Sequence, residues 1–384
     1  MALYTLVAAA ALSVGAGASV AKTQTAAAPL PIPTLTLRGV DASGKPTTVP
    51  MPTIGLGTGF GFTPPGSTTG TYDGVLTWLK AGGRALHAAR MYCNQEAVGL
   101  AIRDSGVPRE ELFVMTMIPQ WHMGTAEAAA SVEVSLKQLN LTYVDLVMVH
   151  WPGTFEWSIP MYPTGDKRCG AAPLPHCHME LCGDVLLEEP KCKAGEISWK
   201  KCRQQTWGAF KALQAKGLAR TIGVSNFETW MLAELDPPAA VNQIPWRVGF
   251  HDDVLAEYSK KHGTVSQSYS PLAGSALAKA ANDSTIGLIA AAHKVSAAQV
   301  ALRYIVQSGG AAIPKSSTTA YMKEDADVFS WSLSSKEMLA LALVNTPSAE
   351  GAKSMNDPTS MMCQNKTSGR MARCLYLDIP GIEL

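Results

Sequence analysis

The feature that most constrains the fold is an alternation of short apolar runs with longer amphipathic stretches, which begins at residue 53 and continues past residue 316. The apolar runs are "TIGLGT", "RALHAA", "LFVMTMI", "VDLVMVHW", "RTIGVSN", "AAVNQIPW", "TVSQSYSP" and "AAIPKS". Each run has the length of a buried strand, and each is followed by a stretch of helical periodicity. Eight such units in about 280 residues predict a (β/α)8 barrel of the TIM type, in the α/β class.

The expected helices lie at residues 72–82, 94–106, 125–139, 198–217, 227–236, 252–263, 285–294 and 296–309, with one more after residue 316. Ahead of them, residues 35–52 alternate apolar and polar side chains around "DASGKP", which predicts an N-terminal β-hairpin. A doubly wound open sheet is the alternative fold. Its dinucleotide-binding form needs a G-x-G-x-x-G turn after the first strand, and no such motif follows "TIGLGT", so the barrel is favoured.

The two ends of the chain and one internal segment fall outside this pattern. The N-terminus is apolar from Leu3 to about Gly15, and "SVA" then fits a cleavage site, which is typical of a secretory signal peptide. A membrane anchor is the alternative, but the apolar run is short for a span. We expect these segments: signal peptide 1–21, linker 22–34, barrel 35–345 with a Cys-rich insertion at 153–203 after the fourth strand, and C-terminal tail 346–384.

The cysteines agree with a secretory or extracellular location. Five of the eight gather in the insertion, at Cys169, Cys177, Cys182, Cys192 and Cys202. In an oxidising compartment such a cluster predicts disulfide bonds, whose pairing the sequence does not give. The motif "HCHMELC" could instead bind zinc, but disulfides explain the whole set more simply, so no metal is predicted. Three Asn-x-Ser/Thr motifs, at Asn140, Asn282 and Asn365, are candidate glycosylation sites.

The net charge of +1 gives no electrostatic reason to expect nucleic acid or an anionic membrane as a partner. We expect a monomer that acts on a small molecule. In a barrel the chemistry lies at the C-terminal ends of the strands. The residues expected there are Gly57, Thr58, His87, Met117, His150, Trp151, Ser225, Asn226, Gln243, Tyr269, Ser270, Lys315 and Ser316. Each alone could be a hydrogen-bonded core residue, but so many polar groups at one rim predict a pocket.

These motifs identify a resemblance. The chain resembles the aldo-keto reductases over about residues 35–345, through "IGLGTG", "GGRALHAARMYCNQEAVGLAI", "VPREELFVMT", "SLKQLNLTYVDLVMVHWP", "GLARTIGVSNF", "VNQ", "SYSPL" and "AAIPKS". The resemblance implies an oxidoreductase that transfers a hydride between NADP(H) and a small carbonyl or alcohol substrate. It also implies four catalytic residues: a tyrosine that protonates the carbonyl oxygen, a lysine that lowers the tyrosine pKa, an aspartate that holds the lysine, and a histidine.

Two of these four positions match the family and two do not. The tyrosine corresponds to Tyr92 and the histidine to His150, whereas His87 replaces the aspartate and Met117 replaces the lysine. The two replacements are coherent, because either charge without the other would be a buried ion with no partner. If protonated, His87 could supply a cation near Tyr92 or relay its proton, so we treat it as a third catalytic candidate. The alternative is that His87 is structural.

The resemblance also implies a cofactor site. Ser225, Asn226 and Gln243 correspond to the residues that bind the nicotinamide amide, Tyr269 to the ring that stacks on it, and Lys315 and Ser316 to the 2′-phosphate site. We include Gly57, Thr58 and Ser270 as cofactor-binding candidates at the same rim. Two further positions differ: Tyr321 replaces an arginine and Asp325 an asparagine, which weakens the case for tight NADPH binding and leaves NAD(H) open.

Three functions remain open at this level. The first is an NADP(H)-dependent oxidoreductase that is slow or altered in substrate. The second is a secreted, catalytically inactive binding protein on the same scaffold. The third is a lyase or isomerase in which His87, Tyr92 and His150 transfer protons without a hydride. The insertion at 153–203 follows the fourth strand beside the pocket, so it could narrow the pocket as a lid or simply stabilise the barrel.

Overall fold

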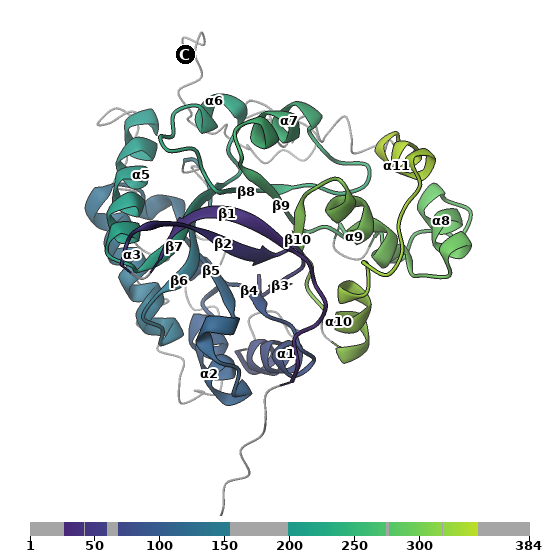
Figure 1. The fold of residues 1–384 in the computed structure, drawn as a ribbon, viewed down its shortest axis with the longest axis horizontal. Helices are drawn as coiled ribbons and strands as arrows, with labels where there is room; N and C mark the ends of the chain where they lie inside the picture. Colours follow the sequence, from purple (N-terminus) through teal and green to yellow (C-terminus); the bar gives the residue numbers. More distant parts are fainter. Residues whose placement is uncertain are drawn as a thin grey trace, which may run out of the picture.

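The computed structural model describes residues 27–41, 43–59, 68–153, 199–273, 276–316 and 318–344. Its centre is a sheet of eight parallel strands that neighbour one another in sequence order (Figure 1). The strands are β3 (Leu56–Gly57), β4 (Ala85–His87), β5 (Phe113–Ile118), β6 (Val144–Val149), β7 (Ala219–Ser225), β8 (Val241–Pro245), β9 (Val265–Tyr269) and β10 (Ala311–Ile313). Each coincides with one of the eight apolar runs.

The sheet closes on itself between its first and last strands. The amide of Gly55 donates to the carbonyl of Ala312 at 3.0 Å, the amide of Ala312 donates to Thr53 at 2.8 Å, and that of Gly57 donates to Pro314 at 2.9 Å. A Cβ atom at Gly57 would lie 2.9 Å from the carbonyl oxygen of Ile313, so only glycine allows the edges to approach this closely. The predicted (β/α)8 barrel is therefore confirmed.

Helices surround the strands on all sides (Figure 1). They are α1 (Thr68–Lys80), α2 (Gln95–Ser105), α3 (Thr125–Leu139), α5 (Trp199–Ala215), α6 (Thr229–Leu232), α7 (Asp253–Lys261), α8 (Thr285–His293), α9 (Ala297–Gln307), α10 (Thr319–Ala326) and α11 (Ser335–Ala342), with short 3-10 turns η1 (Arg90–Tyr92), η2 (Arg109–Glu111) and η3 (Gln120–His122). No single helix in the described ranges is long and apolar enough to cross a membrane; α8 and α9 pass that test only as a joined pair, bent by 94°.

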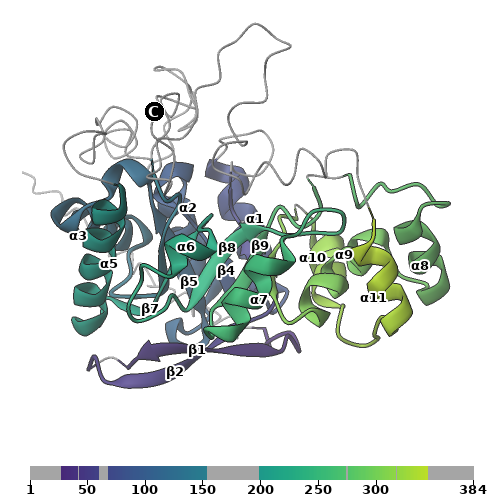
Figure 2. The ribbon, with the colours of Figure 1, turned by 90° about the horizontal axis from the view of Figure 1, so that it is seen from above.

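The predicted hairpin is also confirmed and lies across one end of the barrel (Figure 2). Strands β1 (Thr34–Val40) and β2 (Pro46–Pro52) pair antiparallel. Leu37, Val49 and Met51 on the hairpin are buried in the same apolar cluster as side chains from inside the barrel. On β1, Arg38 donates to the carbonyls of Pro238 and Ala239, which precede β8. The hairpin thus covers the N-terminal ends of the strands, and the opposite end is left for the site.

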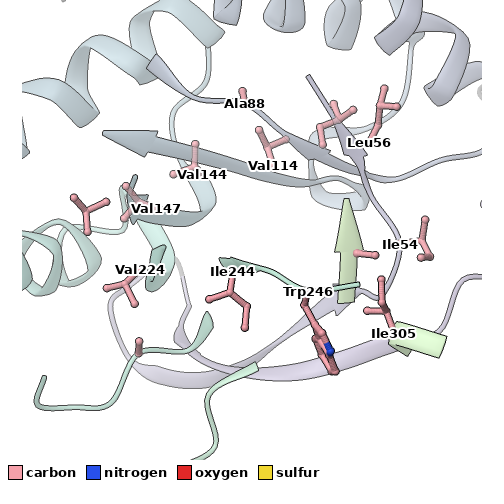
Figure 3. Close-up of a cluster of buried hydrophobic side chains, with 14 of the residues drawn as sticks. Ile54, Leu56, Ala88, Val114, Val144, Val147, Val224, Ile244, Trp246 and Ile305 are labelled. Atoms are coloured by element: carbon pink, nitrogen blue, oxygen red, sulfur yellow. The ribbon is translucent and has the colours of Figure 1, made fainter. Parts of the chain in front are cut away.

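Two apolar layers stabilise the barrel. The outer layer lies between the strands and the helices, and Figure 3 shows part of it, including Ile54, Val147, Ile244 and Trp246. The inner layer fills the barrel itself and contains Met51, Met115, Met117 and Met148. Because the strands are buried on both faces, their sequences are nearly continuous apolar runs, and this is why they could be recognised.

The remaining predictions about the chain ends and insertion fall mostly outside the described residues. The signal peptide, nearly all of the insertion, four of its five cysteines and the tail lie there. Cys202 is described, and its side chain is fully buried on α5. Asn140 and Asn282 are both exposed, as a glycosylation site must be.

Candidate active site

His87 ends β4 with its imidazole inside the protein. The residue is 1% exposed, and its Nε2 atom has no hydrogen-bond partner among the described residues. Burial, reinforced by the neighbouring His150, lowers the pKa of His87 from 6.5 to about 3. The imidazole is therefore neutral at pH 7. The idea that a protonated His87 replaces the missing cation does not fit this environment, whereas a neutral proton relay does.

Tyr92 lies at the end of η1, between two histidines. Its ring meets the ring of His87 edge-on with centroids 5.9 Å apart, and that of His150 edge-on at 5.6 Å. A Cβ atom at Gly59 would lie 3.2 Å from Cζ and 3.3 Å from the hydroxyl of Tyr92. Glycine at this position therefore leaves the tyrosine hydroxyl room at the rim.

His150 follows β6 and is held there by its backbone. Its amide donates to the carbonyl of Ile118 at 3.0 Å, and its carbonyl accepts from Nδ2 of Asn226 at 3.0 Å. The Nδ1 atom is buried without a hydrogen-bond partner in the described part of the chain, and burial lowers the pKa of His150 to about 4. Two neutral imidazoles therefore flank Tyr92, and each can donate one hydrogen bond and accept another.

Met117 occupies the position where the resemblance implies a lysine. Its side chain is fully buried in the inner apolar layer, against which the ring of Tyr92 also packs. A thioether carries no charge, so Met117 cannot favour the phenolate form of Tyr92 as an ammonium group would. This end of the site offers hydrogen-bonding groups without the Asp–Lys ion pair of the family.

A second group of polar residues lies at the ends of β7, β8 and β9. The Ser225 hydroxyl donates to the Gln243 carbonyl at 2.9 Å, and Gln243 Nε2 donates to Oε1 of Gln267 at 2.7 Å. Asn226, with a left-handed φ of 61°, donates to Ser225 Oγ at 3.0 Å and accepts from the Tyr269 hydroxyl at 3.0 Å. Burial raises the pKa of Tyr269, which therefore stays a neutral donor.

Asn226 joins the two groups. Its amide contacts the backbone of His150 on one side, and its oxygen accepts from Tyr269 on the other. The fold thus brings Tyr92, His87 and His150 to the same rim as Ser225, Asn226 and Tyr269. Their predicted roles stay predictions, and the contacts of Asn226 with His150 and Tyr269 link the two groups.

Three other candidates have mainly structural contacts. The carbonyl of His87 accepts from both the amide and the hydroxyl of Thr58, at 3.1 and 2.9 Å. Gly57 closes the barrel, as described above. Ser270 is exposed after β9 with a left-handed φ of 49°. The Thr58–His87 contact explains how the end of β4 is fixed in position.

The third group follows β10. The Lys315 ammonium lies 3.4 Å from the carbonyl oxygen of Gly59, and burial lowers its pKa. The hydroxyl of Ser316 donates to the carboxylate of Asp325 on α10. Burial raises the pKa of Asp325 to about 6, although the hydrogen bond from Ser316 opposes that shift. Tyr321 is exposed on the same helix.

Sequence reasoning missed two residues at this rim. Asn94 is buried, donates to the carbonyl of Thr58 at 2.9 Å and has a buried Oδ1 without a partner among the described residues. Gly59 faces the Tyr92 hydroxyl. The signal for Asn94 was its polarity two residues after the tyrosine, at the start of the expected helix 94–106. The described residues contain no group of three or more His, Cys, Asp or Glu that could hold a metal.

A tyrosine between two neutral imidazoles, next to a network of hydrogen-bonding side chains, is an arrangement suited to polarising and protonating a small polar ligand. The comparisons with known proteins agree with the barrel and its rim. The model of the Aldo/keto reductase family matches residues 53–345, and the chain belongs to that family.

Two of its relatives carry the names of oxidoreductases, and the match covers a larger share of each relative than of this chain. Glyoxal reductase of Bacillus subtilis is 31% identical over 301 residues, which cover 77% of this chain and 90% of that protein. Glycerol 2-dehydrogenase (NADP(+)) of Saccharomyces cerevisiae is 31% identical over 323 residues, covering 81% and 92%. The crystal structure of a Bombyx mori aldo-keto reductase in complex with NADP covers 82% of this chain and 93% of its own, with a TM-score of 0.65 and 24% identity, a likeness of fold.

Proposed function

We propose that this protein is a nicotinamide-nucleotide-dependent oxidoreductase that interconverts a small carbonyl compound and its alcohol, with chemistry slower than that of an enzyme with an intact Asp–Lys pair. The observation that carries the proposal is the direct connection, through Asn226, between the Tyr92–His150 pair and the polar network of Ser225 and Tyr269. A site for a planar amide and a site for a proton donor are thereby held side by side.

The residues present fit the nicotinamide end of such a cofactor. A carboxamide needs paired donors and acceptors, which Ser225, Asn226 and Gln243 provide, and a flat ring needs an aromatic face, which Tyr269 provides. The Nδ1 atom of His150, which has no hydrogen-bond partner in the described ranges, lies at the same rim as Asn226. When bound, the nicotinamide would supply or accept the hydride. NADP(H) is the starting hypothesis, because the name of the yeast glycerol 2-dehydrogenase includes NADP(+) and the Bombyx mori enzyme was crystallised with NADP.

The chain's own residues would handle the proton. The Tyr92 hydroxyl donates a proton to the carbonyl oxygen during reduction and recovers it during alcohol oxidation. His150 donates or accepts a hydrogen bond as a neutral imidazole and so orients the oxygen. His87, also neutral, can pass a proton to or from Tyr92. Because Met117 cannot lower the pKa of Tyr92, we expect a loss of about 100- to 10,000-fold in rate relative to an assisted phenol.

The substrate class follows from the relatives. Their names indicate dicarbonyl and polyol chemistry, so we propose a small carbonyl or alcohol as substrate. The test is a screen of small aldehydes, dicarbonyls and polyols that follows nucleotide absorbance, with wild type and Tyr92→Phe in parallel. Slow turnover that Tyr92→Phe abolishes supports the proposal. Binding of the nucleotide with no turnover on any substrate contradicts it.

That second outcome would favour a catalytically inactive binding protein. The specific observation for this alternative is that Met117 and two neutral histidines leave Tyr92 without the ion pair of the family. A lyase or isomerase is a further alternative, favoured by the convergence of His87, Tyr92 and His150. It would convert substrate with no nucleotide present, which separates it from the first proposal.

We also propose that the protein is a secreted, glycosylated monomer. The supporting features are the signal-like residues 1–21, the cysteine cluster at 169–202, and the exposure of Asn140 and Asn282. Mass spectrometry of protein secreted from eukaryotic cells tests this. We expect an N-terminus near residue 22, disulfide-linked peptides and glycans. A cytosolic product with an intact N-terminus and reduced cysteines would contradict the proposal.

A further inference from the structure

The loop between β10 and α10 carries the third group of polar residues at the rim, Lys315 and Ser316. In barrel enzymes, the loops after the last two strands and the start of a nearby helix commonly bind a phosphate group. Here that loop carries Lys315 and Ser316. Both face groups of the chain itself: the ammonium of Lys315 lies by the carbonyl of Gly59, and the hydroxyl of Ser316 donates to Asp325.

Asp325 is the unusual member of this group. It is 4% exposed, yet it places a carboxylate directly against the hydroxyl of Ser316. A buried carboxylate is tolerated where it accepts hydrogen bonds, and Ser316 supplies one. A phosphate that contacted Ser316 would have to displace that bond, and two anions would then be neighbours. Glu324, the preceding residue on α10, adds another negative charge and helps to raise the pKa of Asp325.

The cations of this loop and of α10 are two separate lysines, Lys315 and Lys323. Lys315 is a single ammonium, and burial lowers its pKa, which disfavours its charged form. Tyr321, exposed on the first turn of α10, carries no charge. A phosphate dianion is held best by a bidentate guanidinium, and this position on the helix does not supply one. A pair of ribose hydroxyls makes the opposite demand, because it donates hydrogen bonds and is well matched by a carboxylate.

We propose that Asp325 and Ser316 make this chain select NAD(H) over NADP(H). The inference rests on the nicotinamide-nucleotide site proposed above and names its cofactor. The Asp325 carboxylate accepts a hydrogen bond from an unmodified 2′-hydroxyl, directly or through Ser316, and repels a 2′-phosphate. The family's usual preference for the phosphorylated nucleotide is thereby reversed.

The test is a direct binding titration of the folded protein with NADH and with NADPH, followed by nucleotide fluorescence at pH 8, where Asp325 is ionised. We expect wild type to bind NADH at least about tenfold more tightly than NADPH, which corresponds to a difference in binding free energy of about 1.4 kcal/mol. Asp325→Asn removes the charge and keeps the shape, so it should raise NADPH affinity about tenfold with little change for NADH. Asp327→Asn, an exposed charge two residues away, is the matched control and should change neither.

A second variant keeps the test valid if Asp325→Asn, at a buried position, fails to fold. Tyr321→Arg changes an exposed residue, so it should fold normally, and its guanidinium should raise NADPH affinity while leaving NADH affinity within about twofold. Tighter binding of NADPH than NADH by wild type, or an unchanged ratio in both variants, overturns the inference but not the proposed function. Failure of wild type to bind either nucleotide at millimolar concentration overturns both.

Discussion

The end of the site at β4, β5 and β6 differs sharply from the end at β7, β8 and β9. At the first, His87 and His150 have buried nitrogens without hydrogen-bond partners in the described structure, and Met117 lies in the inner apolar layer. At the second, Ser225, Asn226 and Tyr269 form a connected set of hydrogen bonds. A network that satisfies itself can persist without ligand, whereas the orphaned nitrogens at the other end still need a partner.

The difference agrees with the proposal that the catalytic end of this barrel has changed while the nucleotide-binding end is retained. An aspartate and a lysine that pair inside a protein must be lost together, because either one alone is a buried charge without compensation. In the proposed correspondence His87 and Met117 stand in place of such a pair, and both side chains are neutral at pH 7. The network at β7 to β9 lies on other strands and meets the first end only through the hydrogen bond from Asn226 to the His150 carbonyl among the contacts described above.

The largest effect should follow from removing the proton donor. Tyr92→Phe should lower any carbonyl reduction by about 100-fold or more, the usual contribution of a general acid, because no other described hydroxyl lies between the two histidines. Nucleotide affinity should change by less than about twofold, since Ser225 and Tyr269 are untouched. Steady-state turnover and a nucleotide titration on the same preparation measure the two. Unchanged turnover would show that the chemistry lies elsewhere.

Introducing an Asp–Lys pair at positions 87 and 117 should increase turnover. His87→Asp with Met117→Lys should raise turnover by about 10- to 100-fold, because the ammonium favours the phenolate form of Tyr92. Each single variant should instead lose about 3 kcal/mol or more of unfolding free energy, as an unpaired buried charge. Urea denaturation and turnover of the four proteins complete a double-mutant cycle. Additive effects would mean that the two positions no longer face each other.

Acid should destabilise the protein partly through His87. Its pKa is lowered to about 3 in the folded state from 6.5, so its contribution to stability is fully present above pH 6.5 and is lost as pH falls from 6.5 toward 3. Compared with His87→Gln, wild type should lose about 2 to 3 kcal/mol more unfolding free energy between pH 7 and pH 4.5. Parallel urea curves at both pH values measure this. Equal losses in the two proteins would place the imidazole in contact with water.

The smallest effect concerns the network at the other end. Tyr269→Phe removes the hydroxyl that donates to Asn226 and keeps the aromatic face, so nucleotide affinity should fall by about fivefold, or about 1 kcal/mol. Tyr258→Phe on α7, whose ring stacks on His262, is the control and should leave affinity unchanged. A Tyr269→Phe variant with unaltered affinity would mean that the network does not prepare the site for its ligand.

The sequence predicted the barrel well because its strands are buried on both faces and read as unbroken apolar runs. It also predicted which residues gather at the rim, since parallel strands end at one edge. It missed α11, whose start is marked by the capping box of Ser334 and Glu337, because one helix was expected after residue 316 where two are present. The expected helix at 227–236 is in fact the single turn α6.

Properties that depend on burial could not be read from the sequence. His87 is neutral because the fold buries it, which lowers its pKa. From the sequence alone, a histidine could equally be protonated. The hydrogen bond between Ser316 and Asp325 joins a loop to a helix, and the two residues are nine positions apart in the sequence. Sequence periodicity does not predict a contact of this kind. The roles predicted for the site residues remain predictions.

The most direct test is a crystal structure of the mature protein with a bound nicotinamide nucleotide. The account predicts the carboxamide on Ser225, Asn226 and Gln243, the nicotinamide ring against Tyr269, and the Tyr92 hydroxyl facing the reactive face of that ring. A nucleotide bound elsewhere, or a crystal soaked at millimolar nucleotide whose network is unchanged and empty, would contradict the claim that the binding end survives while the catalytic end has changed.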